Sequence, residues 1–274
     1  MSSDKVNPFL KWAGGKRWLT EKHINIFPEF KGKYFEPFLG GGAVFFSLAP
    51  KFARLSDLNG ELIQTYRALK ADWRSVRKVL EVHHSRHSPD YYYQVRNSTP
   101  RTEHTKAARF IYLNRTCWNG LYRVNLKGEF NVPIGTKSNV LMECDDFERL
   151  AERLSQVELF TCDFEDTINE ACEGDLIFAD PPYTVKHNLN GFVKYNEKIF
   201  SWEDQERLAN ALKRASGRGC IVVSTNAYHP VVKDLYTEDF ELAAMNRSSV
   251  IAASSDFRGV YEELLVTNFK VSSI

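Results

Sequence analysis

Short apolar runs alternate with helical patterns along this chain of 274 residues. The run Leu176–Ala179 reads as a buried strand, and Asp180 ends it. Strands that alternate with helices predict an α/β fold, in which a mostly parallel sheet carries helices on both faces. The predicted strands lie within residues 33–38, 53–57, 156–163, 174–180 and 219–226, with a last edge strand in residues 263–271.

Helical periodicity marks the segments between these strands. One helix is predicted from about Gly60, and two others lie within residues 145–156 and 201–215. In the last of these, Ser201 is suited to cap the helix, with Asp204 three residues later. Ligands of open α/β sheets bind beyond the carboxyl ends of the strands. Three aspartates lie at such ends, namely Asp57, Asp163 and Asp180.

Residues 60–140 interrupt the alternation of strands and helices. They begin with helical segments, continue through a Tyr-rich stretch and a helix at residues 106–115, and end in two short extended runs. Lys127-Gly128 separates those runs, which predicts a β-hairpin. We therefore predict a mainly helical domain of residues 60–140, carrying a hairpin and inserted into an α/β domain of residues 1–59 and 141–274.

Positive charge is concentrated in the inserted segment, although the formal net charge of the chain is only +1. Between His83 and Val140, nine Lys and Arg residues stand against three Asp and Glu residues. A local excess of this kind is typical of a surface that binds a polyanion. A solvated basic face is the alternative interpretation.

The composition argues against several other classes of protein. No apolar run approaches the roughly 20 residues that cross a bilayer, and the amino-terminal residues lack the layout of a signal peptide. The five cysteines form no C-x-x-C pair, which argues against a zinc site or a disulfide framework. We expect a cytoplasmic protein with no metal, no membrane association and no obligate protein partner.

A glycine-rich turn, F-L-G-G-G at residues 38–42, opens a helical pattern. Glycine lets the backbone approach a ligand without obstruction from a Cβ atom. The chain has neither a P-loop nor a full G-x-G-x-x-G pattern, and Asp57 closes the next strand. A carboxylate there can accept two hydrogen bonds from ribose hydroxyls, which suits an adenosyl cofactor without phosphates. A purely structural turn is the alternative.

The tetrad Asp180-Pro181-Pro182-Tyr183 is the most specific chemical pattern in the chain. The carboxylate and the carbonyl of Pro181 are two acceptors held at a fixed spacing, which suits the two hydrogens of an NH₂ group. Holding both hydrogens points the lone pair of the amine at an incoming electrophile. The ring of Tyr183 supplies a flat face for a planar base. A Pro-rich turn with a buried Tyr is the alternative.

These blocks resemble, in order along nearly the entire chain, the Dam-type DNA adenine-N6 methyltransferases. The matching segments are FLKWAGGKR (9–17), YFEPFLGGGAVFF (34–46), LSDLNGELI (55–63), LNRTCWNGLYRVNLKGEFNVPIG (113–135), FADPPY (178–183) and SSDFRGVYEELLVTNF (254–269). The resemblance implies a Rossmann-like methyltransferase sheet, S-adenosylmethionine as methyl donor and double-stranded DNA as substrate. It also implies a prokaryotic or phage-infected cell, with the enzyme associated with the nucleoid.

The resemblance assigns site residues by their motif positions. Gly40 and Gly42 should lie beneath the methionine portion of the cofactor, Asp57 should hold the ribose, and Asp163 with Phe164 should contact the adenine ring. The full cofactor set comprises Trp12, Lys16, Gly40, Gly42, Asp57, Asp163, Phe164 and Asp180. The catalytic set comprises Asp180, Pro181, Pro182 and Tyr183, which act on an adenine that is flipped out of the duplex.

The resemblance also implies that the inserted segment reads the sequence GATC. Arg123 is the candidate for a bidentate contact with guanine, worth about 1–3 kcal/mol of discrimination. Leu121 and Pro133 are candidates for contact with thymine methyl groups, and Trp118 is a candidate wedge near the flipped base. The DNA-binding set comprises Lys11, Trp118, Asn119, Leu121, Arg123 and Pro133, with Lys127 and Lys137 as phosphate contacts or plain solvated charges.

Two features depart from the closest pattern of the family. Cys117-Trp118 stands in place of Gly-Tyr, and residues 252–259 lack a Gly-Gly pair and a basic run. Both concern the choice of target rather than the chemistry. The alternatives are a methyltransferase acting on RNA adenine or protein glutamine, and a catalytically decayed DNA-binding relative. Asp180 and the basic inserted segment favour DNA, and a role in host methylation, in a phage or in restriction-modification stays open.

Overall fold

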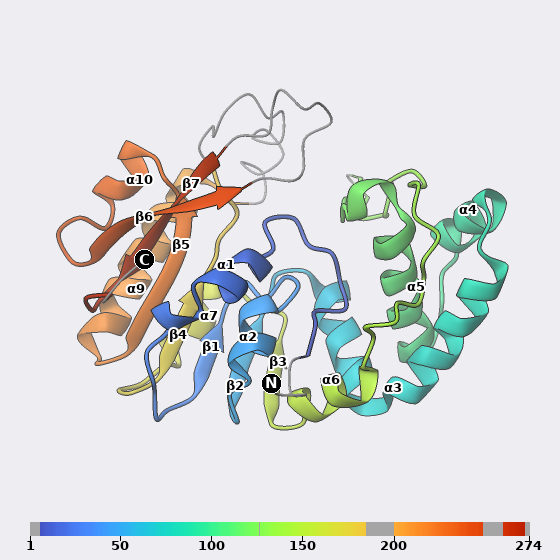
Figure 1. The fold of residues 1–274 in the computed structure, drawn as a ribbon, viewed down its shortest axis with the longest axis horizontal. Coiled ribbons are helices and arrows are strands. Elements are labelled where there is room, and N and C mark those ends of the chain that lie inside the picture. Colours follow the sequence, from blue (N-terminus) through green and yellow to red (C-terminus); the bar gives the residue numbers. More distant parts are fainter. Residues whose placement is uncertain (1–5, 126, 185–199, 249–259, 272–274) are drawn as a thin grey trace. The chain divides into compact units, whose positions relative to one another are not determined.

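The protein is described by a computed structural model that covers residues 6–125, 127–184, 200–248 and 260–271. Its strands form a seven-stranded sheet in the order β3-β2-β1-β4-β5-β7-β6 (Figure 1). The segment at residues 252–259, which departs from the family pattern, lies outside the described residues. The strands are β1 Tyr34–Glu36, β2 Ala53–Ser56, β3 Val157–Phe160, β4 Leu176–Ala179, β5 Ile221–Ala227, β6 Glu241–Ser248 and β7 Val260–Thr267.

The prediction of a mostly parallel α/β sheet is confirmed. β1 pairs in parallel with β2 and β4, and β4 pairs in parallel with β5. No helix in the described part of the chain is both long and apolar enough to cross a membrane. The helices are α1 Arg17–Lys22, α2 Ala43–Leu48, α3 Gly60–Arg86, α4 Pro89–Asn97, α5 Glu103–Thr116, α6 Phe147–Leu154, α7 Phe164–Asn169, α9 Trp202–Gly217 and α10 Pro230–Asp234, with 3-10 turns η1 Ile24–Ile26 and η2 Trp118–Gly120.

The prediction that the last strand lies at an edge is wrong. β7 pairs antiparallel with β5 on one side and with β6 on the other, so β6 is the edge strand. The sequence of β6, ELAAMNRS, is rich in residues with high helix propensity. Pairing with β7 overrides that local preference, which is why periodicity missed this strand.

The chain divides into two compact units. The helical unit comprises residues 1–20, 39–51 and 57–161, and the sheet unit comprises residues 21–38, 52–56 and 162–274. The domain limits predicted from the sequence stay a prediction.

In the sheet unit, α7 and α9 cover one face of the sheet. Leu208, Leu212 and Ala215 of α9 are buried in one cluster with Ile177 of β4 and Val222 of β5. The capping box predicted for this helix is confirmed, since the Ser201 hydroxyl accepts from the Asp204 amide and the Asp204 carboxylate accepts from the Ser201 amide. Leu208, Leu212 and Ala215, spaced by four and three residues, thus anchor α9 on the sheet.

In the helical unit, α3 packs along α5. The two helical segments predicted within α3 meet at Asp72, whose backbone is not helical and whose carboxylate accepts from the Ser75 amide. The chain reverses around Lys127-Gly128 as predicted, but the described residues of that segment pair only at isolated bridges, Val124–Phe130 and Cys117–Ile134. The Asn125 side chain, which accepts from the amides of Lys127 and Glu129, holds the turn. The predicted β-hairpin is therefore present as an antiparallel reversal whose two runs share one isolated bridge and not a continuous ladder among the described residues.

His83 makes the helical unit sensitive to acid. Its Nδ1 lies 2.9 Å from the Tyr91 hydroxyl and its ring centroid lies 4.8 Å from that of Tyr112. Burial, and then the charge of Arg86, lower the pKa of His83 from 6.5 to about 4. Because the folded state holds the neutral ring, its contribution to stability is present above pH 6.5 and is lost as the pH falls towards 4.

We expect the free energy of unfolding to fall less between pH 7 and pH 4 in His83→Gln than in the wild type. Since the ring is partly exposed, we expect a difference on the order of 1–2 kcal/mol. Urea titrations at the two pH values measure this difference in the free energy of unfolding, with His84→Gln, at an exposed histidine, as the control. Equal acid sensitivity of the wild type and His83→Gln would contradict this assignment.

Candidate active site

The D-P-P-Y tetrad begins at the residue that follows β4. The Thr225 hydroxyl of β5 donates a hydrogen bond of 2.8 Å to Oδ1 of Asp180. The Tyr183 hydroxyl donates a hydrogen bond of 2.8 Å to Oε2 of Glu263 on β7, a carboxylate that is only 3% exposed. Asp180 and the ring of Tyr183 are half-buried, so both are fixed by neighbours and still reach the surface.

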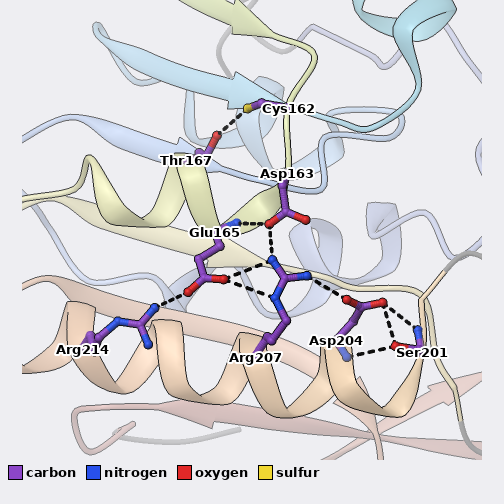
Figure 2. Close-up of polar contacts among 8 residues, drawn as sticks. All are labelled: Cys162, Asp163, Glu165, Thr167, Ser201, Asp204, Arg207 and Arg214. Carbon is purple, nitrogen blue, oxygen red and sulfur yellow. Dashed lines mark hydrogen bonds and ion pairs between the residues drawn. The ribbon is translucent and has the colours of Figure 1, made fainter.

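Asp163 and Phe164 lie at the start of α7. Asp163 caps this helix, since its Oδ1 accepts from the Glu165 amide at 2.9 Å. The same oxygen accepts from the guanidinium of Arg207 on α9 at 2.8 Å. Figure 2 shows that Arg207 also contacts Glu165 and Asp204, while Arg214, about two turns further along α9, contacts Glu165. A network of three carboxylates and two guanidinium groups therefore holds the predicted adenine contact.

The ring of Phe164 is enclosed by protein. It is 2% exposed, stacks on Phe38 at 5.4 Å between centroids, and packs against Phe200 at 5.6 Å. The Arg207 guanidinium carbon lies 4.8 Å from its centroid. A ligand at this position can reach the backbone of residue 164, whose amide belongs to the unpaired first turn of α7, but not the face of the ring.

In the helical unit, the glycine-rich turn is closed by Asp57. Its Oδ2 accepts from the Gly40 amide at 3.0 Å and its Oδ1 accepts from the Asn59 amide at 2.9 Å. Gly40 and Gly42 have φ of 47° and 66°, in the left-handed region that favours glycine. Burial raises the pKa of Asp57, and the two backbone donors only partly oppose this. Acid therefore protonates Asp57 at a higher pH than an ordinary aspartate.

Trp12 and Lys16 complete this group. A Cβ atom on Gly40 would come within 2.6 Å of the Trp12 indole, so the indole packs directly on the turn. The indole also stacks on Tyr122, with 5.8 Å between ring centroids. Lys16 is 4% exposed, and its ammonium donates to the carbonyl of Gly14 at 3.0 Å. The structure thus brings Trp12, Lys16, Gly40, Gly42 and Asp57 into one unit, and Asp163, Phe164 and the tetrad into the other.

The predicted DNA-reading side chains between residues 117 and 135 lie on one chain reversal. The Trp118 amide donates to the carbonyl of Pro133 at 2.9 Å, and the Asn131 amide donates to the carbonyl of Arg123 at 3.1 Å. The Trp118 side chain is 53% exposed, a large share for an indole. Asn119, with φ of 56°, turns the backbone between Trp118 and Leu121.

Arg123 is oriented by its neighbour across the reversal. Its Nε donates to Oδ1 of Asn131 at 2.9 Å, and its side chain is exposed. The hydrogen bond uses the inner nitrogen of the guanidinium and leaves the two terminal NH₂ groups for a ligand. Two parallel donors are what a bidentate contact requires.

Lys11 joins the same cluster through a residue that sequence reasoning missed. The side-chain amide of Asn114 on α5 accepts from the Lys11 amide at 2.9 Å and donates to the Lys11 carbonyl at 2.8 Å. It also donates to the carbonyl of Gly120 at 3.3 Å. Asn114 is 1% exposed, so one buried amide ties the segment before Trp12 to the reversal after α5.

Arg115, the next residue of α5, also fixes this region. It is 1% exposed and donates to the carbonyls of Phe9 and Val140 and, in a bidentate pair, to Asp145. An adjacent Asn and Arg directly after the apolar residues FIYL is the sequence signal that could have indicated buried polar roles. The contacts of Thr225, Glu263 and Arg207 had no such local signal.

The fold and the tetrad together define a class. A mostly parallel sheet that ends in the antiparallel strands β7 and β6, with D-P-P-Y directly after β4, is that of a Rossmann-like methyltransferase. Among the described residues, no group of three or more His, Cys, Asp or Glu is placed to hold a metal ion.

Comparison with known proteins specifies the class further. The family profile of the D12 class N6 adenine-specific DNA methyltransferases matches residues 12–251, and the chain belongs to this family. It is 36% identical over 280 residues to Type II methyltransferase M1.LlaDCHI of Lactococcus lactis subsp. cremoris, covering 98% of each chain. It is 34% identical over 290 residues to Type II methyltransferase M.MjaIII of Methanocaldococcus jannaschii, covering 97% of this chain and 100% of the relative. It is 36% identical over 218 residues to a DNA adenine methylase of Haemophilus influenzae, covering 76% and 75%.

The resemblance seen in the motifs is therefore confirmed at the level of the family. The chain is an adenine-specific DNA methyltransferase, of a family that depends on S-adenosylmethionine.

Proposed function

We propose that this enzyme methylates N6 of adenine within GATC in double-stranded DNA, using S-adenosylmethionine and a flipped-out target base. The observation that carries the proposal is the anchored tetrad after β4. Asp180 is held by Thr225, and Tyr183 is held by Glu263, so an acceptor and an aromatic face have fixed positions. Relatives with the names Type II methyltransferase and DNA adenine methylase support DNA adenine as the substrate.

The residues of the glycine-rich turn fit an adenosyl group. Each oxygen of Asp57 accepts one backbone N–H and keeps a lone pair for a ribose hydroxyl. We propose Gly40 and Gly42 as the floor of the methionine portion, beside Trp12 and Lys16. For the adenine ring we propose the Asp163 carboxylate and the backbone of residue 164, since the Phe164 ring is enclosed.

When bound, S-adenosylmethionine supplies an electrophilic methyl group on a positively charged sulfur. The work of the protein is then to align the amine and to stabilise the charge that develops on nitrogen. In the proposed complex, Asp180 and the Pro181 carbonyl accept the two hydrogens of N6, which directs the nitrogen lone pair at the electrophile. Pro182 keeps the tetrad rigid, and the Tyr183 ring stacks on the base.

Base flipping follows from the position of N6. Inside a duplex N6 is paired, so the target adenine must leave the stack at a cost of a few kcal/mol. We propose that the exposed Trp118 indole occupies space near the vacated position, with Asn119 shaping the turn that presents it. Leu121, Pro133 and Lys11 lie on the same cluster as Trp118, which supports a shared role in reading the site.

Arg123→Ala should weaken discrimination at one guanine of the site. The two terminal NH₂ groups of this side chain are oriented for a bidentate contact, whose loss costs about 1–3 kcal/mol. We expect kcat/KM on GATC duplexes to fall about 5- to 150-fold, with a much smaller fall on duplexes altered at that guanine. Arg123→Lys, which keeps the charge but not the fork, is the matched control. A uniform loss on every DNA sequence would show a phosphate contact instead.

The test of the proposed function is transfer of labelled methyl groups. The protein is incubated with labelled S-adenosylmethionine and unmethylated duplex, RNA or protein, and the DNA is digested with nucleases that differ in tolerance of methylated GATC. We expect label in DNA and changed cleavage at GATC. Label in RNA or protein alone would overturn the choice of DNA, and no label anywhere would favour a decayed relative.

A further inference from the structure

Three consecutive polar residues of β5 meet the chain where it leaves β4. Ser224, Thr225 and Asn226 are each completely buried. The parallel ladder between β4 and β5 ends at the pair Ala179–Ser224, while β5 continues to pair with β7 through Ala227. β5 therefore remains a paired strand beside the segment after β4, which no longer pairs with it.

The three side chains alternate between the two faces of the sheet. Ser224 and Asn226 share a face with Val222, which is buried in one cluster with α9, whereas Thr225 points to the other face. On that other face the Thr225 hydroxyl donates to Asp180 at 2.8 Å. The carboxylate accepts, so the threonine hydroxyl is the donor in this pair.

On the α9 face, a buried amide extends the same support. The side-chain amide of Asn226 donates to Oε1 of Gln205 at 2.9 Å. Gln205, which is completely buried, donates to the Thr184 hydroxyl at 2.8 Å and to the Pro182 carbonyl at 3.4 Å. Buried amides of this kind require partners, and a network whose members are satisfied selects a single geometry.

We propose that Thr225 is a positioning residue for methyl transfer, which sets the plane of the Asp180 carboxylate while Asn226 and Gln205 hold the loop that follows. The inference rests on the proposed role of Asp180 as acceptor of the N6 hydrogens. Thr225 thus keeps the Asp180 carboxylate aligned for the N6 hydrogens.

Two substitutions separate positioning from packing. Thr225→Val keeps the volume of the side chain and removes the donor, whereas Thr225→Ser keeps the donor and removes a methyl group. We expect the single-turnover rate of methyl transfer to fall about 10- to 100-fold in Thr225→Val and to stay within about threefold of the wild type in Thr225→Ser. A role in packing alone predicts the reverse order. Thr267→Val, which removes a buried hydroxyl of β7 that donates to the Phe269 carbonyl, is the matched control and should keep the wild-type rate.

Binding measurements complete the test. Dissociation constants of S-adenosylmethionine and of a GATC duplex should be unchanged in Thr225→Val. Thermal unfolding of each variant establishes that it is folded. A wild-type rate in Thr225→Val, or an equal loss in Thr225→Ser, would overturn the inference while methylation by the wild type stands. Absence of transfer by the wild type would overturn the proposed function, and the inference with it.

Discussion

Asp180→Ala is expected to reduce methyl transfer by about 10³-fold or more while S-adenosylmethionine still binds. The side chain is half-buried, anchored by Thr225, and placed directly after β4. Without its carboxylate, the amine loses the acceptor that directs the nitrogen lone pair and stabilises the charge developing on N6. The loss should therefore appear in kcat rather than in the affinity for cofactor.

Single-turnover transfer from labelled S-adenosylmethionine to a GATC duplex measures this effect, with cofactor binding followed separately by equilibrium dialysis. Asp180→Asn keeps one acceptor oxygen and should retain more activity than Asp180→Ala. Asp166→Ala, which removes an exposed aspartate on α7, is the control and should be fully active. If Asp180→Ala kept a rate within tenfold of the wild type, the tetrad would not hold the amine.

Arg115→Met is expected to lower the free energy of unfolding by about 3–5 kcal/mol. The guanidinium is completely buried, and its removal leaves the Asp145 carboxylate, 9% exposed, without the bidentate partner it has at 2.6 and 2.7 Å. The carbonyls of Phe9 and Val140 lose donors at the same time. Each unpaired buried group adds a desolvation penalty.

Urea unfolding provides the measurement, and the neighbouring pair provides the control. Arg149 and Asp146 form an ion pair at 3.4 Å with side chains 42% and 47% exposed. Arg149→Met should therefore cost less than about 1 kcal/mol. Replacing Arg115 and Asp145 together by apolar residues should recover part of the loss, because no uncompensated charge is left. A loss in Arg115→Met no larger than that in Arg149→Met would contradict a structural role for the buried pair.

The parts of the fold that could be predicted from the sequence are those with strong local patterns. Five short apolar runs and the capped helix α9 appear where periodicity and Ser201 place them. β6 could not be predicted, because its Ala- and Met-containing sequence favours a helix in isolation and becomes a strand only by pairing with β7. The run that forms β7 was recognised, but its interior position in the sheet depends on β6.

The candidate site likewise combines residues that the sequence identifies with surroundings that only the structure shows. Trp12, Gly40, Asp57 and the tetrad are recognisable because motifs combine a few residue types at fixed spacing. Whether a ligand can reach each of these groups depends on the side chains packed around it in the folded protein. The Phe164 ring looked suited to an adenine contact, yet Phe38, Phe200 and Arg207 enclose it.

The sequence by itself determined the order of strands and helices, the chemical groups of the tetrad and the family. These are properties of neighbouring residues and of motifs in chain order. Only the tertiary structure decided which groups hold Asp180, Tyr183 and Lys11 in place. Their partners Thr225, Glu263 and Asn114 lie 45, 80 and 103 residues away. Such contacts depend on the pairing of β5 with β7 and on the packing of α5, which no local periodicity encodes.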